Sequence, residues 1–268
     1  MIASLKQFFR PQTARAPLAT VPEGQRFYVV GDIHGRRDLF DALIEAVDAD
    51  DAARDDADTT IVLLGDLVDR GPDSAGVIRS ARDWGQRRPV RYIAGNHEEM
   101  FLQSFEDTEM LRHFLKHGGR ETVLSYGLDR GTYNSLTLAE LQDEIAEIVP
   151  REDREFLAGF EDMIIAGDYL FVHAGIDPSR PIDQQRSSDL RWIRERFLNS
   201  TESHDHVVVH GHTIFEDVED RGTRIGIDTG AFRSGRLTAL MLEGKERVFI
   251  QAVERDGAIE IEHVGGRS

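Results

Sequence analysis

Five short motifs in this chain place side chains that can bind a metal or move a proton directly after apolar runs. They are GDIHG at 31–35, GDLVDRG at 65–71, GNHE at 95–98, VHAG at 172–175 and VHGHT at 209–213. A continuous apolar run is typical of a buried strand, and a following glycine allows a tight turn. Because open α/β sheets bind ligands at the carboxyl ends of their strands, we expect the five motifs to meet at one site.

The motif side chains offer the oxygen and nitrogen donors that hold divalent cations. We predict two metal sites that share Asp66: the first is formed by Asp32, His34 and Asp66, and the second by Asp66, Asn96, His173 and His212. This mixture of ligands favours Mn, Fe or Zn over Mg or Ca, and we expect two divalent ions, with manganese preferred. Two cations about 3.5–4 Å apart are a common arrangement for displacement at phosphorus. Taken alone, GDLVDRG is equally compatible with a turn that caps a helix.

The segments between the motifs predict how these side chains are positioned. Apolar patterns indicate strands at 26–31, 59–64 and 90–94, with amphipathic helices at 38–47 and 72–84 between them. Alternation of strand and helix predicts a parallel sheet with right-handed crossovers. The acidic stretch 48–58 is expected to be a solvated connection.

Beyond the third motif the pattern becomes helical and then returns to strands. We expect a helical insert at about 100–160, within a domain that spans 26–264 and follows a flexible extension at 1–25. Strands are then expected at 163–166, 169–173, 206–209, 224–227, 237–242, 248–254 and 259–263, the first two as a hairpin. Short strands joined by turn residues predict a mainly antiparallel second sheet packed on the first.

Composition excludes several classes of function. The 268 residues include 40% hydrophobic side chains, enough for a full core. A net charge of -17 argues against a nucleic-acid or membrane-surface partner, since phosphate groups repel such a surface. Cysteine is absent, which excludes disulfides and a cysteine nucleophile. No run approaches the ~18 apolar residues of a membrane span, and we expect a cytoplasmic protein.

Taken together and in this order, the motifs resemble the calcineurin-like metallophosphoesterase superfamily, and within it the bacterial phosphoprotein (serine/threonine) phosphatases. The resemblance covers about residues 26–240. It implies an α/β fold, an α/β/β/α sandwich of two mixed sheets with helices outside and a helical insert. It also implies a hydrolase in which a water bridging the two metals attacks phosphorus directly, without a covalent enzyme intermediate.

The resemblance assigns further roles to individual residues. His97 is expected to protonate the leaving oxygen, oriented by Asp69. Arg70 and Arg194 are expected to bind the substrate phosphate together with Asn96, because a guanidinium matches two phosphate oxygens at once. Trp192 is expected to be a packing residue that fixes Arg194.

The chain also departs from patterns of related enzymes. Gly211-His212-Thr213-Ile214 lacks the final histidine of the GHxH motif, which leaves the first metal with three protein ligands. The tyrosine-bearing loop of eukaryotic protein phosphatases has no match at 228–231. His210 is either a packed strand residue or an additional group at the metal site.

The expected substrate is a phosphorylated protein or a small phosphoester, with phosphoserine and phosphothreonine preferred. The alternatives are a symmetrical dinucleoside tetraphosphate hydrolase and a broad-specificity phosphodiesterase. Such tetraphosphate hydrolases commonly lack the second aspartate of the central motif and carry GNHD, so Asp69 and Glu98 favour the phosphatase. A catalytically silent scaffold would be expected to have lost a ligand or the histidine–aspartate pair, and none is missing here.

Overall fold

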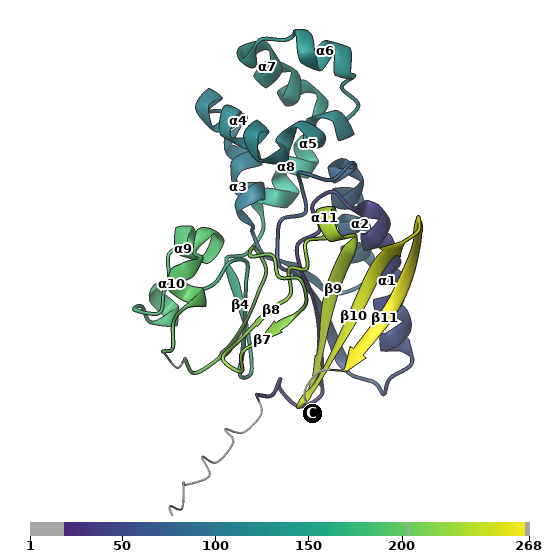
Figure 1. Cartoon of the computed structure of the whole chain (residues 1–268), viewed down its shortest axis with the longest axis vertical. Helices are drawn as coiled ribbons and strands as arrows, with labels where there is room; N and C mark the ends of the chain where they lie inside the picture. The colour runs from purple at the N-terminus through teal and green to yellow at the C-terminus, as the bar shows by residue number, and fades with distance from the viewer. Residues whose placement is uncertain (1–18, 203, 266–268) are drawn as a thin grey trace, which may run out of the picture.

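Two stacked β-sheets with helices on their outer faces form the body of the protein in the computed structural model, which describes residues 19–202 and 204–265 (Figure 1). The larger sheet has the strand order β11-β10-β9-β1-β2-β3 and the smaller one the order β4-β5-β6-β8-β7. The strands of the larger sheet are β1 (Gln25–Val30), β2 (Asp58–Leu63), β3 (Val90–Tyr92), β9 (Arg236–Glu243), β10 (Glu246–Arg255) and β11 (Ala258–Gly265). Those of the smaller sheet are β4 (Met163–Ala166), β5 (Tyr169–Val172), β6 (Val207–His210), β7 (Glu219–Asp220) and β8 (Arg224–Gly226).

The first half of the chain forms the predicted parallel unit. Strand β1 pairs in parallel with β2, and β2 with β3. The crossovers are α1 (Arg37–Ala52) and α2 (Ser74–Arg87), and the side chain of Asp73 caps α2 by accepting the backbone N–H of Gly76. This arrangement brings the carboxyl ends of β1, β2 and β3 to one edge, from which the first three motifs emerge.

Alternating side chains of each strand separate the core into layers. Tyr28 and Val30 of β1 pack outward in a cluster that includes residues of α1 and α2. Phe27 and Val29 face the smaller sheet and pack in a second cluster. The outer face of the smaller sheet is covered by α9 (Ser187–Trp192) and α10 (Glu195–Leu198). The two mixed sheets between helices confirm the predicted fold class.

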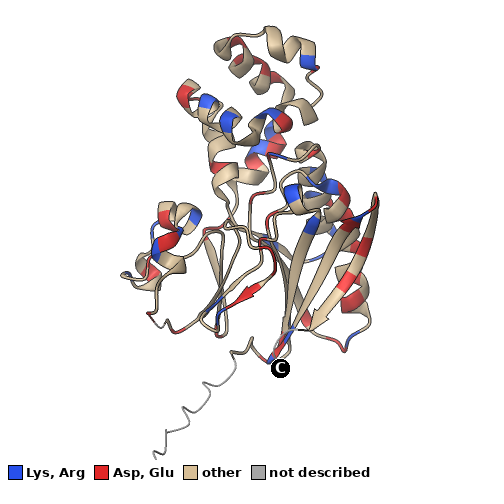
Figure 2. Cartoon of the chain, in the orientation of Figure 1, with Lys and Arg blue, Asp and Glu red and all other residues tan. Residues whose placement is uncertain are grey.

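A block of short helices lies above the sheets, and we call it the helical insert (Figure 1). It consists of α3 (Asn96–Gln103), α4 (Thr108–Phe114), a kinked segment (Leu115–Gly119), α5 (Arg120–Ser125), α6 (Arg130–Ser135), α7 (Leu138–Ile148) and α8 (Arg151–Ala158). Figure 2 shows acidic residues on several of these helices and also on β7 and β11. Residues 1–18 of the predicted N-terminal extension lie outside the described residues.

The expected antiparallel second sheet is wrong. Strands β9, β10 and β11 extend the first sheet, with β9 antiparallel to β1. In the smaller sheet only the outer pairs are antiparallel, because β5, β6 and β8 pair in parallel. Hydrophobic alternation predicts that a segment is a strand, but it contains no information about the strand's partner.

The acidic stretch after α1 is also more structured than expected. Helix α1 continues to Ala52, and Asp51 forms ion pairs with Arg26 and Arg88. Arg26 is almost completely buried, so its charge needs these acidic partners. No helix in the described part of the chain combines the length and apolar character required to cross a membrane.

Candidate dinuclear metal centre and acid pair

Backbone strain is concentrated at the predicted site. Within residues 19–202 and 204–265, six residues other than glycine have a positive φ. Five of these belong to the motifs: His34, Asp66, Asp69, Arg70 and His212. The left-handed region costs an L-residue about 1–2 kcal/mol, and such conformations persist where the surrounding fold imposes them. The fold therefore holds these side chains in positions that the local sequence does not favour.

Glu98 joins the GDLVDRG and GNHE loops. Its buried carboxylate accepts the backbone N–H groups of Asp66 (2.8 Å), Leu67 (2.7 Å) and Gly95 (3.0 Å). Gly65 has φ 95°, and a Cβ there would lie 2.5 Å from the backbone nitrogen of Gly95. Both oxygens of the Glu98 carboxylate are thus bonded to the backbone of the two loops. Glu98 can therefore affect substrate choice only indirectly, through the positions of these loops.

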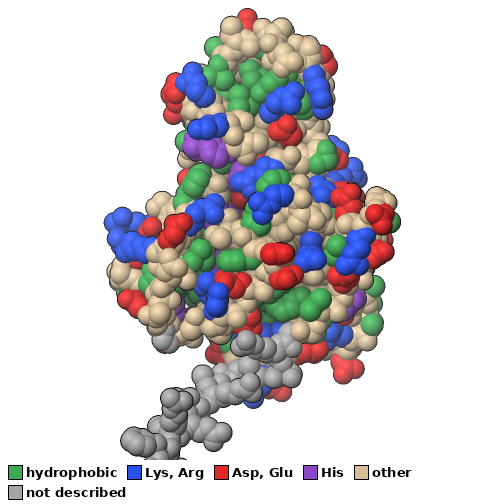
Figure 3. All heavy atoms as spheres, viewed as in Figure 1, with side chains coloured by type: hydrophobic (Ala, Val, Ile, Leu, Met, Phe, Trp, Pro, Cys, Tyr) green, Lys and Arg blue, Asp and Glu red, His purple; other side chains and the backbone are tan. Residues whose placement is uncertain are grey.

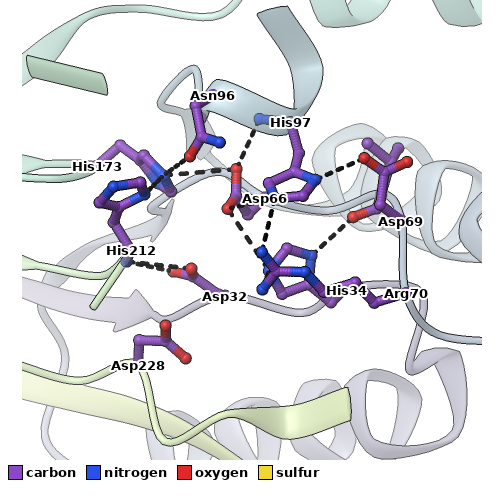
Figure 4. Close-up of polar contacts among 12 residues, drawn as sticks. Asp32, His34, Asp66, Asp69, Arg70, Asn96, His97, His173, His212 and Asp228 are labelled. Carbon is purple, nitrogen blue, oxygen red and sulfur yellow. Dashed lines mark hydrogen bonds and ion pairs between the residues drawn. The ribbon is translucent and has the colours of Figure 1, made fainter. Parts of the chain in front are cut away.

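Two groups of buried side chains each bring three potential ligand atoms within 4.8 Å of one another. The first contains His34, Asp66 and His97, and the second contains Asp66, His173 and His212. Asp66 belongs to both, and Figure 4 shows its carboxylate between the surrounding imidazoles. This position is the one predicted for a bridging ligand.

The chemistry of the donor atoms fits a cation in the second group. His173 Nδ1 lies 2.8 Å from the carbonyl oxygen of Leu64, which makes it the protonated nitrogen. Its Nε2 therefore carries a lone pair, yet it faces the carbonyl oxygen of Asn96 at 3.1 Å. Two acceptors facing each other repel unless a positive charge lies between them. His212 Nδ1 lies 3.2 Å from the same His173 nitrogen, so Asn96 Oδ1 and His212 Nδ1 both face His173 Nε2.

The pKa shifts at the site distinguish the candidate metal ligands from the candidate acid, His97. Burial lowers the pKa of His34 and His173 below the ordinary histidine value, and it lowers the pKa of His212 to about 2. Burial alone would raise the pKa of Asp66, but the positive charge of protonated His97 beside it helps to hold that pKa well below its ordinary value. Neutral imidazoles and an ionised carboxylate are the forms that bind metal ions.

The pKa of His97 shifts in the opposite direction to the pKa values of the other three histidines. Its Nδ1 lies 2.5 Å from Asp69 Oδ2, and both side chains are buried. Burial alone would lower the pKa of His97, but the charges of Asp66 and Asp69 and the hydrogen bond to Asp69 raise it above the usual value. Although His97 lies within the first group, its proton makes it a donor rather than a metal ligand. The predicted acid pair is thus assembled beside Asp66.

Asp32 lies at the edge of this arrangement. Its two carboxylate oxygens are 3.1 Å from the backbone nitrogen of His212, and Asp32 falls outside both groups of ligand atoms. Burial raises its pKa, and the negative charges of Asp228 and Asp66 raise it further. The role of Asp32 as a metal ligand therefore stays a prediction.

Asp228 is a site residue that the sequence analysis missed. It is buried near Asp32 (Figure 4), and its Oδ1 accepts the N–H of Gly230 at 2.9 Å. Its Oδ2 has no hydrogen-bond partner, and burial raises its pKa to about 6. Its position in the sequence could have indicated this, because Asp228 comes just after the short buried strand β8, as the motif residues come after their strands.

The two predicted phosphate-binding arginines both reach the site. Arg70 places its Nη atoms 2.9 Å from His34 Nε2 and from His97 Nε2, and its guanidinium lies over the Phe232 ring at 4.8 Å. Arg194 is exposed and donates from Nη1 to the carbonyl oxygen of His212 at 3.3 Å. On the face seen in Figure 3, Lys and Arg side chains gather where the helical insert meets the sheets.

The structure bears on the packing role expected for Trp192 and on the two alternatives for His210. The expected packing role of Trp192 is wrong, since its side chain is 38% exposed and its ring centre lies 6.4 Å from that of His212. Its indole N–H donates to Glu99 at 2.9 Å. His210 is buried with its ring 5.2 Å from Phe197, and it falls outside both ligand groups, which favours the packed-strand alternative.

The family model for the calcineurin-like phosphoesterases matches residues 25–234, which is most of the chain and includes all five motifs. The chain belongs to this family. Calcineurin-like phosphoesterases are dinuclear metal-dependent hydrolases, and this chain contains the corresponding groups of candidate ligands. The resemblance inferred from the motifs is confirmed, as is the assignment of the chain as an enzyme.

Relatives within the calcineurin-like phosphoesterases carry two kinds of name. The chain is 27% identical over 247 residues to an asymmetrical bis(5'-nucleosyl)-tetraphosphatase PrpE of Bacillus velezensis, covering 84% of this chain and 92% of the relative. It is 28% identical over 223 residues to serine/threonine-protein phosphatase 1 of Salmonella typhimurium, covering 81% and 91%. The solved structure of a putative diadenosine tetraphosphatase shares the fold with a TM-score of 0.57 at 23% identity, covering 93% of this chain and 99% of that one.

Proposed function

We propose that this calcineurin-like phosphoesterase hydrolyses phosphomonoesters, foremost phosphoserine and phosphothreonine in proteins. The observation that carries the proposal is the buried His97–Asp69 pair, joined at 2.5 Å beside Asp66. A serine or threonine side chain leaves phosphorus as a poor, strongly basic alkoxide, so its departure requires a proton from a positioned acid. A phosphate group that leaves from an anhydride is already a stable anion and needs that proton much less.

The chain's residues divide the remaining work between them. Two metal ions held around Asp66, manganese in preference to iron or zinc, would polarise the phosphoryl oxygens and supply hydroxide at neutral pH. We assign Asp32 and His34 to one ion, and Asn96, His173 and His212 to the other. Arg70 and Arg194 bind the phosphate oxygens, because guanidinium groups bind them in pairs.

A parallel assay tests this proposal. Manganese-loaded protein is offered a phosphoserine peptide, diadenosine tetraphosphate and a chromogenic phosphodiester at equal concentrations, and kcat/KM is measured for each. We expect the phosphoserine peptide to be turned over with the highest kcat/KM. A higher value for either of the other two substrates would contradict the proposal.

Diadenosine polyphosphates are the second candidate substrate, and exposed Trp192 is the observation that favours them. Its ring lies beside His212, where a nucleobase of a bound dinucleotide could stack, and the PrpE relative is named for such a reaction. Stacking of one base on an aromatic side chain contributes about 1–3 kcal/mol. If dinucleotides are substrates, Trp192→Ala should raise their KM by roughly tenfold or more, whereas Trp192→Phe should raise it less. An equal KM in both variants and the wild type would remove this role of the ring.

Arg194 provides a test of phosphate binding. A hydrogen bond to a charged group contributes about 1.5–3 kcal/mol, so Arg194→Ala should raise KM for a phosphoserine peptide by roughly tenfold or more. The melting temperature should change little, because Arg194 is exposed. The matched control is Arg196→Ala, since Arg196 is also exposed and pairs instead with Asp177 and Ser179. If both variants raise KM equally, Arg194 has no specific role.

A further inference from the structure

Apart from α3, which carries Asn96 and His97, the helical insert contacts the catalytic centre through the side chain of Thr122 on α5. Thr122 is completely buried, and its hydroxyl donates to Asp69 Oδ1 at 2.6 Å. The other carboxylate oxygen of Asp69, Oδ2, faces His97 Nδ1 at 2.5 Å. Each oxygen of Asp69 therefore has a different partner, and the two partners together determine the plane of the carboxylate.

The Thr122 hydroxyl is held in place by a small buried network. The backbone N–H of Asp69 points at Thr122 Oγ1 (2.9 Å) and at Ser74 Oγ (3.0 Å), and the two hydroxyl oxygens are 3.0 Å apart. Because the Thr122 proton is donated to Asp69, Ser74 must be the donor between the two hydroxyls. The network thus fixes the direction of the Thr122 hydroxyl proton toward the carboxylate.

The insert also contacts the next residue of the same turn. The backbone N–H of Arg70 donates to the carbonyl oxygen of Gly118 at 3.1 Å. Gly118 has φ 110°, and a Cβ at this position would lie 2.7 Å from Arg70 Cγ. Asp69 and Arg70 both have positive φ, at 75° and 68°. Contacts from the insert therefore brace the strained part of the GDLVDRG turn.

We propose that Thr122 is a positioning residue for the acid pair: its hydroxyl orients Asp69 so that Oδ2 holds His97 with Nε2 beside the Arg70 guanidinium, where the leaving oxygen of a phosphate bound by Arg70 would lie. The inference rests on the proposed phosphomonoesterase function. Thr122 has no exposed surface and so does not contact substrate. Its effect reaches the reaction through Asp69 and His97 alone, and the helical insert is part of the catalytic apparatus as well as a cover beside it.

Leaving-group dependence tests this role. Thr122→Val keeps the shape of the side chain but removes its hydroxyl. Supporting groups of this kind typically change activity by about 10–100-fold. We expect such a loss in kcat with phenyl phosphate, a poor leaving group, and a much smaller loss with 2,4-dinitrophenyl phosphate, which needs no acid. KM and metal content should stay unchanged, and Thr122→Ser, which restores the hydroxyl, should recover most of the activity.

The control is Thr132→Val, because Thr132 also bonds an aspartate, Asp129, but lies on an exposed part of the insert. It should behave like the wild type with both esters. Equal losses with both esters in Thr122→Val, or no recovery in Thr122→Ser, would overturn the proposal. If the valine variant does not fold, Thr122→Ala is measured in its place against the same criteria.

A spectroscopic measurement separates this inference from the proposed function. The proton on His97 Nδ1, which points at Asp69, should give a downfield ¹H NMR signal in the wild type that Asp69→Asn removes. Thr122→Val should shift or broaden that signal, whereas Thr132→Val should not. This result is expected whichever phosphoester the enzyme prefers, and an unchanged signal in Thr122→Val would refute the positioning role.

Discussion

Asp66→Asn is expected to remove at least one of the two metal ions and to lower kcat by roughly 10³-fold or more. Asp66 is the only residue shared by the two groups of ligand atoms, so its charge would support both ions. Loss of several kcal/mol of transition-state stabilisation corresponds to a rate reduction of this size, at about 1.4 kcal/mol per tenfold. Metal content by elemental analysis and turnover of a phosphoserine peptide are the two measurements.

The substitution is designed to leave the backbone intact. Asp66 has φ 51°, a conformation that asparagine also tolerates, and the amide oxygen of asparagine can still accept the N–H of His97. Asp129→Asn serves as the control because it also replaces an aspartate, at an exposed helix cap where asparagine functions equally well. Full metal occupancy in Asp66→Asn would show that Asp66 does not bridge the ions.

The second large effect is expected for His97→Asn. Asparagine can still donate to Asp69 but carries no proton that it could transfer to a leaving oxygen. General acid catalysis contributes typically 10²–10⁴-fold, and we expect a loss in this range with a phosphoserine peptide while metal content is retained. An ester with a good leaving group should lose far less. Undiminished turnover of the peptide would remove His97 as the acid.

The pH dependence follows from the same pair. The charges of Asp66 and Asp69 raise the pKa of His97 above its ordinary value of 6.5, although burial opposes this shift. The protonated, active form should therefore persist to higher pH, and the alkaline fall in kcat should begin above pH 6.5. Asp69→Asn removes one of the charges that raise the pKa, so it should move that fall to lower pH. A profile that does not change in this variant would contradict the pairing.

The local sequence was sufficient to locate the centre of the site. Each motif follows its own apolar strand, and strand ends in an α/β sheet converge on one edge. For that reason Asp66, His173 and His212 could be recognised as neighbours although they lie far apart in the chain. The same rule applied to the end of β8 would have identified Asp228.

Tertiary packing alone decided which residue orients Asp69 and which strands pair with one another. Thr122 lies 53 residues from Asp69, on a helix whose sequence contains no signal for a contact with that carboxylate. The partners of β9, β10 and β11 were not predictable either, because hydrophobic alternation predicts a strand's faces and not its neighbours. Strand ends and their ligands follow from short-range rules, whereas the orientation of Asp69 depends on how the helical insert packs against the GDLVDRG turn.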